Sequence, residues 1–80
     1  MLPPKSDPIW KEIILSSHDL KLKALPSQML MMRVRLLAKD RTPQKIEEAI
    51  SIAYSFFETN QLIVQEDIAT IFNSYYQEKK

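Results

Sequence analysis

The 80-residue chain contains no glycine, and this absence limits its possible folds more than any other feature of the sequence. Glycine adopts positive φ at little cost, so the two-residue turns of tight β-hairpins are disfavoured in a chain without it. The phosphate-binding loops of the common nucleotide-binding enzymes also depend on glycine. The sequence therefore favours short helices joined by polar turns and argues against a nucleotide-binding enzyme.

The chain is also short, which limits how much apolar surface it can bury within itself. We predict a single domain, and its one core is expected to supply only about 3–5 kcal/mol of net stability. Cysteine is absent, so disulfides and cysteine-based zinc sites are excluded. Self-association is the remaining way to bury more surface, and we expect a homodimer or a subunit that docks on a larger protein.

Apolar residues recur at helical spacing in several segments, and turn residues separate these segments. We predict an all-α bundle of four short helices, at about 8–17, 27–39, 43–59 and 65–77. Residues 1–6 and 78–80 are expected to fray at the two ends of the chain.

The helix boundaries follow from capping residues. Ser6 or Asp7 can accept hydrogen bonds from the start of the first helix, and Thr42 can do the same for the third. Asn60 is expected to end the third helix in a left-handed conformation, because no glycine is available. The last two helices are predicted to form a hairpin with Phe56, Phe57, Phe72 and the tyrosines along its seam. Trp10 is the expected anchor of the first helix.

The segment QMLMMRVRLLAK, residues 28–39, allows two interpretations. Its residues are strong helix formers, and only Val34 is β-branched, which favours the helix over 27–39. The alternative is an α+β fold, in which residues 20–37 form a β-hairpin and association would take place along a strand edge.

As a helix, this segment would be apolar on nearly all sides, and a chain of this size has too few other residues to cover every side. We therefore predict a partner-binding surface made of Met29, Met31, Met32 and Arg35, with Lys39 and Arg41 at its rim. Methionine suits such a surface because its side chain is flexible and polarisable.

Charge is distributed unevenly along the chain, although the net charge is only +1. Residues 1–45 hold nine Lys or Arg against four Asp or Glu, whereas residues 46–80 hold two against six. A regulatory or non-specific nucleic-acid-binding protein is therefore the alternative function. Its expected phosphate contacts are Arg33, Arg35, Lys39, Arg41 and Lys45.

No residue pattern indicates catalysis, so we predict neither an enzyme nor a cofactor or metal site. Ser17, His18 and Asp19 are adjacent, and adjacent side chains on a helix point in different directions, so they cannot form a catalytic triad. The paired acids Glu47-Glu48 and Glu66-Asp67 each follow a predicted helix start, where the helix dipole favours negative charge. No apolar run approaches the roughly 18–20 residues that span a membrane, and we expect a cytoplasmic protein.

Overall fold

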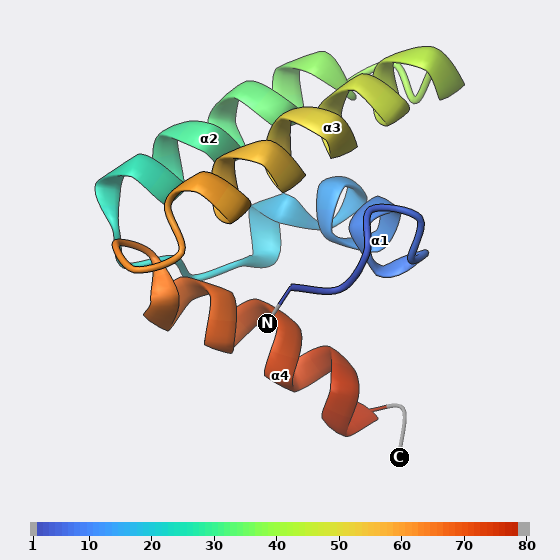
Figure 1. Ribbon diagram of the computed structural model, residues 1–80. Coiled ribbons are helices and arrows are strands. Elements are labelled where there is room, and N and C mark those ends of the chain that lie inside the picture. The colour runs from blue at the N-terminus through green and yellow to red at the C-terminus, as the bar shows by residue number, and fades with distance from the viewer. Residues whose placement is uncertain (1, 79–80) are drawn as a thin grey trace.

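The computed structural model describes the backbone of residues 2–78 and the side chains of residues 2–73. Within these residues the chain is all-α and contains no β-strand, so the hairpin alternative for residues 20–37 is wrong. The elements are α1 (Ile9–Leu15), the short 3-10 helix η1 (Ser17–Asp19), α2 (Leu25–Leu37), α3 (Pro43–Thr59) and α4 (Gln65–Glu78). Figure 1 shows that α2 and α3 lie side by side, and that α1 lies between this pair and α4.

Trp10 lies at the centre of the core, which agrees with the prediction that it anchors the first helix. Its side chain is fully buried, and its ring meets Tyr54 and Phe57 of α3 at centroid distances of 5.5 and 6.2 Å. Phe72 of α4 meets the same ring edge-on at 5.2 Å. One aromatic side chain on a seven-residue helix therefore joins both long C-terminal helices to the N-terminal part of the chain.

The N-terminal residues are held by the same side chain. The indole Nε1–H of Trp10 lies 3.0 Å from the carbonyl oxygen of Pro4 and 3.3 Å from that of Pro3, which is itself buried. Asp7 Oδ1 accepts a hydrogen bond from the backbone N–H of Ile9 at 2.9 Å, so the predicted cap at this helix start is present. The fraying of residues 1–6 and 78–80 stays a prediction, and Met1, Lys79 and Lys80 lie outside the described residues.

The helix α2 is confirmed, but it begins two residues earlier and ends two residues earlier than predicted. Leu25 and Pro26 form its first turn, since proline lacks the N–H that a first turn leaves without a partner. Residues 20–24 lead into it as an extended segment next to η1.

A carboxylate from α4 fixes this extended segment. Asp67 is only 1% exposed, and its two carboxylate oxygens accept the backbone N–H groups of Lys23 and Ala24 at 2.8 and 3.0 Å. Burial opposes the charged form, but these two donors and the positive charge of Lys23 favour it, and the pKa of Asp67 lies below its ordinary value. The buried Ser27 hydroxyl beside it adds to the lowering, although it makes no hydrogen bond of standard geometry.

The third helix, α3, has the bounds that the sequence predicted, but its ends are formed differently. The Thr42 side chain makes no capping hydrogen bond. Asn60 has φ −112°, so it is not left-handed; its side-chain amide instead donates to the carbonyl oxygen of Phe56 at 2.8 Å. Within the described residues, the left-handed conformation is adopted by Arg41, with φ 58°, in the turn between α2 and α3. A bulky side chain stands here because the chain has no glycine to place at this turn.

The helix α4 follows a five-residue connection and crosses beneath α1 instead of packing along α3 alone (Figure 1). Phe57 and Phe72 meet edge-on at 6.4 Å, so part of the predicted seam exists. Phe72 is nevertheless closer to Trp10, which places α1 between the two helices that were expected to form a simple hairpin. The predicted seam residues Tyr75 and Tyr76 lie outside the described side chains.

Candidate interaction surface on α2

One side of α2 is apolar and exposed to solvent. Four side chains are 60–75% exposed along it: Leu25, Met29, Met32 and Leu36. They recur at intervals of four, three and four residues, which places them in one row along the helix. We call this row the α2 stripe. The opposite side of α2 is covered by the rest of the fold, and Leu30, Met31 and Val34 are buried there.

The α2 stripe continues onto the connection between α3 and α4. Leu62 and Ile63 are 87% and 69% exposed, and they share a shallow hollow with Lys23 and Ala24 just before α2. Figure 1 shows this connection beside the first turn of α2. Exposed apolar side chains from two segments far apart in sequence therefore lie at one end of the molecule, and such a patch is typical of an interaction site.

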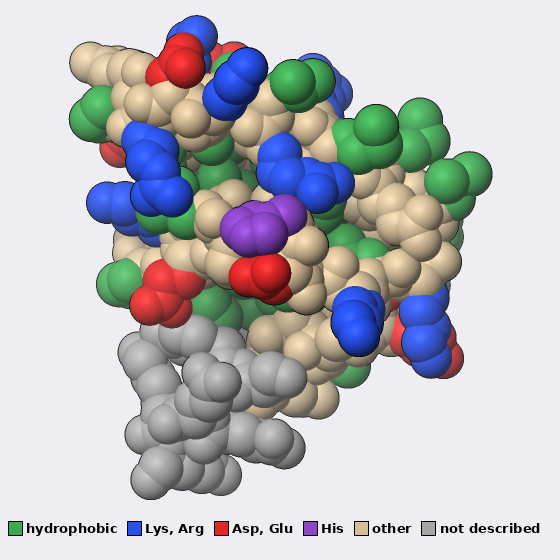
Figure 2. Space-filling model, turned by 180° about the vertical axis from the view of Figure 1, so that it is seen from behind, with side chains coloured by type: hydrophobic (Ala, Val, Ile, Leu, Met, Phe, Trp, Pro, Cys, Tyr) green, Lys and Arg blue, Asp and Glu red, His purple; other side chains and the backbone are tan. Residues whose placement is uncertain are grey.

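Basic side chains border the α2 stripe. At about 100° per residue, Arg33 lies on one side of the row and Arg35 on the other, and Lys39 follows the C-terminal end of α2. Figure 2 shows hydrophobic side chains gathered in one region with Lys and Arg side chains beside them, and no acidic side chain among them on the face in view. Arg35 lies back along its own helix, where its Nε–H donates to the carbonyl oxygen of Met31 at 3.2 Å.

The structure corrects one member of the predicted partner surface. Met31 is 2% exposed and packs in the core beside η1, because it points about 100° away from Met32 around the helix. Met29, Met32 and Arg35 are exposed, as a surface role requires. Lys39 is also exposed and follows the C-terminal end of α2. Arg41 is exposed too, but it lines a different hollow, so it does not border the α2 stripe.

The residues predicted to contact nucleic acid do not form a single patch. Arg33 and Arg35 are exposed on opposite sides of the α2 stripe, with apolar side chains between them. Arg41 and Lys45 lie beyond the end of α2, in the turn and in the first turn of α3. The arrangement therefore presents two basic borders around an apolar row instead of one continuous positive surface.

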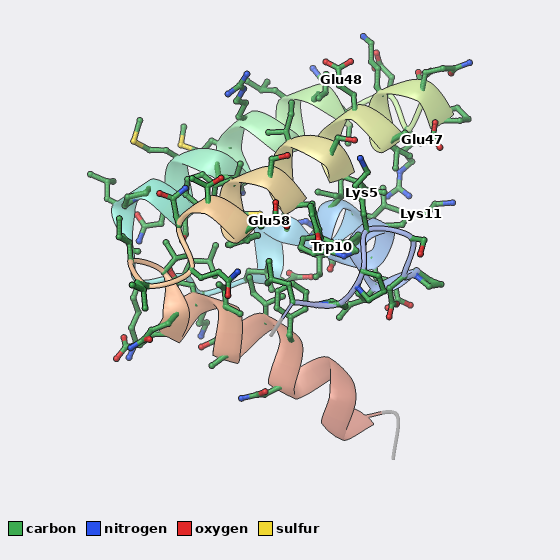
Figure 3. All side chains as sticks on the ribbon, in the orientation of Figure 1. Lys5, Trp10, Lys11, Glu47, Glu48 and Glu58 are labelled. Atoms are coloured by element: carbon green, nitrogen blue, oxygen red, sulfur yellow. The ribbon has the colours of Figure 1, made fainter. Side chains whose placement is uncertain are left out.

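A second hollow lies where the N-terminal segment meets α3. It is lined by charges of both signs, from Lys5 and Lys11 on one wall and Glu47 on the other. Figure 3 shows these three side chains extending from separate segments toward solvent on one side of the molecule. The hollow is shallow and open, and it lacks the convergent polar groups and enclosed apolar walls of a small-molecule site.

Tyr54 lies beside the core and has an altered acidity. Its hydroxyl donates to the Glu58 carboxylate one turn later, and this hydrogen bond, with the negative charge of Glu58, raises the pKa of Tyr54. The phenol therefore stays protonated over the physiological pH range. Glu58 extends from the C-terminal half of α3 (Figure 3), where no second described acid accompanies it on the same helix turn.

The residues that resemble catalytic ones are not arranged for catalysis in the described structure. His18 Nε2 and Asp19 Oδ1 are 3.5 Å apart, and both side chains are exposed. The Ser17 hydroxyl is buried and has no hydrogen-bond partner. Among residues 2–73, no three His, Asp or Glu side chains are placed to hold a metal ion.

No protein-family model matches the chain, and no curated protein or solved structure is similar to it at a significant level. None of the helices in the described part of the chain combines the length and apolar character needed to cross a bilayer.

Sequence reasoning missed two features of this region. The spacing of Leu25, Met29, Met32 and Leu36 was present in the sequence, but Leu25 was placed outside the helix, so the full row was not recognised. The exposure of Leu62 and Ile63 gave no sequence signal, since an apolar pair beside a turn is equally consistent with burial.

Proposed function

We propose that this protein is a small protein–protein interaction module, without catalysis of its own, and that the α2 stripe is its contact surface. The observation that supports this proposal is that four large apolar side chains form one exposed row on α2, on the side of the helix opposite its buried residues. Leaving them in water is unfavourable by about 25 cal/mol for each Å² of apolar surface, so a partner that covers the row gains that free energy. The cytoplasmic location expected from the sequence belongs to this proposal as well.

The nucleic-acid alternative gains no comparable support. Phosphate binding is strongest where basic side chains act together, whereas Arg33 and Arg35 are separated here by the apolar row. Binding to DNA or RNA would also leave the exposed Met and Leu side chains uncovered. Filter binding at low salt tests this alternative, and we expect no retention of either nucleic acid at protein concentrations that saturate a dedicated binder.

Site-specific photo-crosslinking in the cells that produce the protein tests the proposal. A photoreactive side chain replaces Met32 in the α2 stripe, and a matched variant carries it at Ser55, which is exposed on α3. We expect discrete protein adducts from position 32 that are absent from position 55. Adding Leu36→Glu to the Met32 variant should abolish them.

The mass of the adduct shows whether the partner is a second copy of this chain or another protein. A second copy doubles the mass of the chain, whereas another protein adds its own mass. Light scattering of the purified protein gives the same distinction in solution. Adducts of equal pattern and yield at both positions, or none at position 32, would contradict the proposal.

A further inference from the structure

The charges beside the α2 stripe indicate what kind of partner covers it. This inference rests on the proposed function and concerns the chemistry of the partner. The spacing of Leu25, Met29, Met32 and Leu36 is that of the a and d positions in a heptad repeat. The row covers about 17 Å, or three helical turns, at 1.5 Å per residue. A partner helix of similar length can lie along it with side chains from both helices interlocking.

In this repeat Met32 is at a d position and Leu36 at an a position. Arg33 directly follows Met32, and Arg35 directly precedes Leu36. These are the e and g positions, whose charges select the partner in helix pairs. Among the described side chains neither arginine takes part in an ion pair, and residues 25–41 contain four basic residues but a single acid, Asp40. Both borders of the stripe are therefore positive and lack an internal counter-charge.

A second copy of α2 fits these borders poorly. In an antiparallel pair, e positions face e positions and g positions face g positions, so Arg33 would lie opposite Arg33 and the two Arg35 side chains would repel in the same way. In a parallel pair, Arg35 would lie opposite residue 40 of the other copy, but α2 ends at Leu37, before Asp40. Neither orientation supplies opposite charges along the row.

An anionic membrane surface would match the positive borders but not the apolar row. Helices that lie in the membrane interface commonly carry aromatic anchors on the apolar face. Among the side chains of residues 2–73, the large apolar ones that are exposed are Leu, Met and Ile, and none is aromatic. Exposed methionines are instead typical of surfaces that adapt to protein helices.

We propose that the α2 stripe binds one amphipathic helix of another protein, with apolar residues at heptad spacing and Asp or Glu on both flanks. The apolar contacts are expected to supply most of the affinity, and the charge pairs across Arg33 and Arg35 to supply the selectivity. Leu62 and Ile63 extend the apolar contact beyond the first turn of α2.

Synthetic helical peptides of about 21 residues, or three heptads, test this proposal against the full-length protein. Both peptides carry Leu at a and d; one has Glu at every e and g position, and the other has Lys. Fluorescence anisotropy of the labelled peptides measures binding. We expect the Glu peptide to bind tighter than the Lys peptide, on the order of ten-fold, with the difference shrinking as salt is raised.

Charge reversal in the protein decides whether the two arginines determine which peptide is preferred. Arg33→Glu with Arg35→Glu should invert the preference, so that the Lys peptide binds more tightly. Lys5→Glu with Lys11→Glu makes the same change in net charge in the N-terminal hollow, and it should leave the preference for the Glu peptide in place. Should the reversed variant lose its helical circular dichroism, Arg33→Gln with Arg35→Gln replaces it, and the preference should then disappear.

Three results would overturn the proposal: equal binding of the two peptides, a preference that charge reversal leaves unchanged, or tighter binding to anionic lipid vesicles than to the Glu peptide. A dimer that Met32→Glu dissociates would overturn it too, in favour of a second copy. These failures are distinct from failure of the proposed function, because photo-crosslinks from position 32 would persist with any protein partner and would be absent if no protein binds there.

Discussion

Asp67 is the residue whose role differs most from its sequence interpretation. As an acid in the first turn of a helix it was expected to complement the dipole of α4 in solvent, yet it is buried and caps the segment before α2. A capping acid 44 residues away along the chain cannot be recognised from local spacing, because residues 23 and 67 are brought together only by folding. The neighbouring Glu66 is exposed and keeps the role that the sequence indicated.

We expect Asp67→Asn to lower the free energy of unfolding at pH 7 by about 2 kcal/mol, because the amide leaves one buried backbone N–H facing another donor. Urea titration measures this loss, and Glu66→Gln is the matched control with little expected change. Asp67→Asn that is as stable as the wild type would show that the two hydrogen bonds contribute nothing to the fold.

The lowered pKa of Asp67 also predicts how stability depends on pH. Because the unfolded carboxyl binds protons more readily than the folded one, its contribution is fully present above the ordinary value of 3.8. It is lost as the pH falls through the lower folded value. Asp67→Asn should therefore flatten the acid limb of stability against pH, whereas Glu66→Gln should leave the contribution of Asp67 to that limb intact.

At the scale of a single helix, α2 has two apolar sides, of which one is buried in the core and the other is exposed to solvent. Met31 and Met32 are adjacent, yet one is 2% and the other 61% exposed. Helical geometry gives the angle between them, while the positions of α1, η1 and α3 determine which of the two is covered. Comparing substitutions at Met31 and Met32 therefore tests which side of α2 is buried.

We expect Met31→Lys to destabilise the protein by more than about 3 kcal/mol, because it buries a charge without a partner. Such a loss would leave much of the chain unfolded at room temperature, given a net stability of about 3–5 kcal/mol. Met32→Lys should change the stability by less than about 0.5 kcal/mol, as surface substitutions usually do. Thermal unfolding followed by circular dichroism compares the two, and equal effects would contradict the assigned faces.

At the scale of the whole molecule, Trp10 connects elements that are distant in sequence. It is the only tryptophan, and its ring contacts aromatic side chains from both α3 and α4. We expect urea unfolding followed by tryptophan fluorescence to coincide with unfolding followed by circular dichroism, because one core holds all the helices. A fluorescence transition at lower urea, with helicity retained, would show instead that α4 or α1 detaches separately.

The helices themselves were predictable, because apolar spacing and proline positions are local signals. The bounds of α3 were predicted correctly from Thr42-Pro43 and the apolar spacing that follows. The details of its ends were not, since Asn60 caps through its side chain and Arg41 takes the left-handed position. Several residues can satisfy such turns, and the choice depends on how neighbouring helices approach one another.

The candidate site was predictable in part for the same reason. The sequence alone determined that the helix around residues 28–39 has more apolar surface than 80 residues can cover, since this follows from composition and length. Only the tertiary structure decided which side stays exposed. It buries Met31 and Val34, leaves Met29 and Met32 in solvent, and brings Leu62 and Ile63 beside Lys23 and Ala24, just before α2. The reason is physical: periodicity defines the faces of a helix, but only the packing of other elements determines which face is covered.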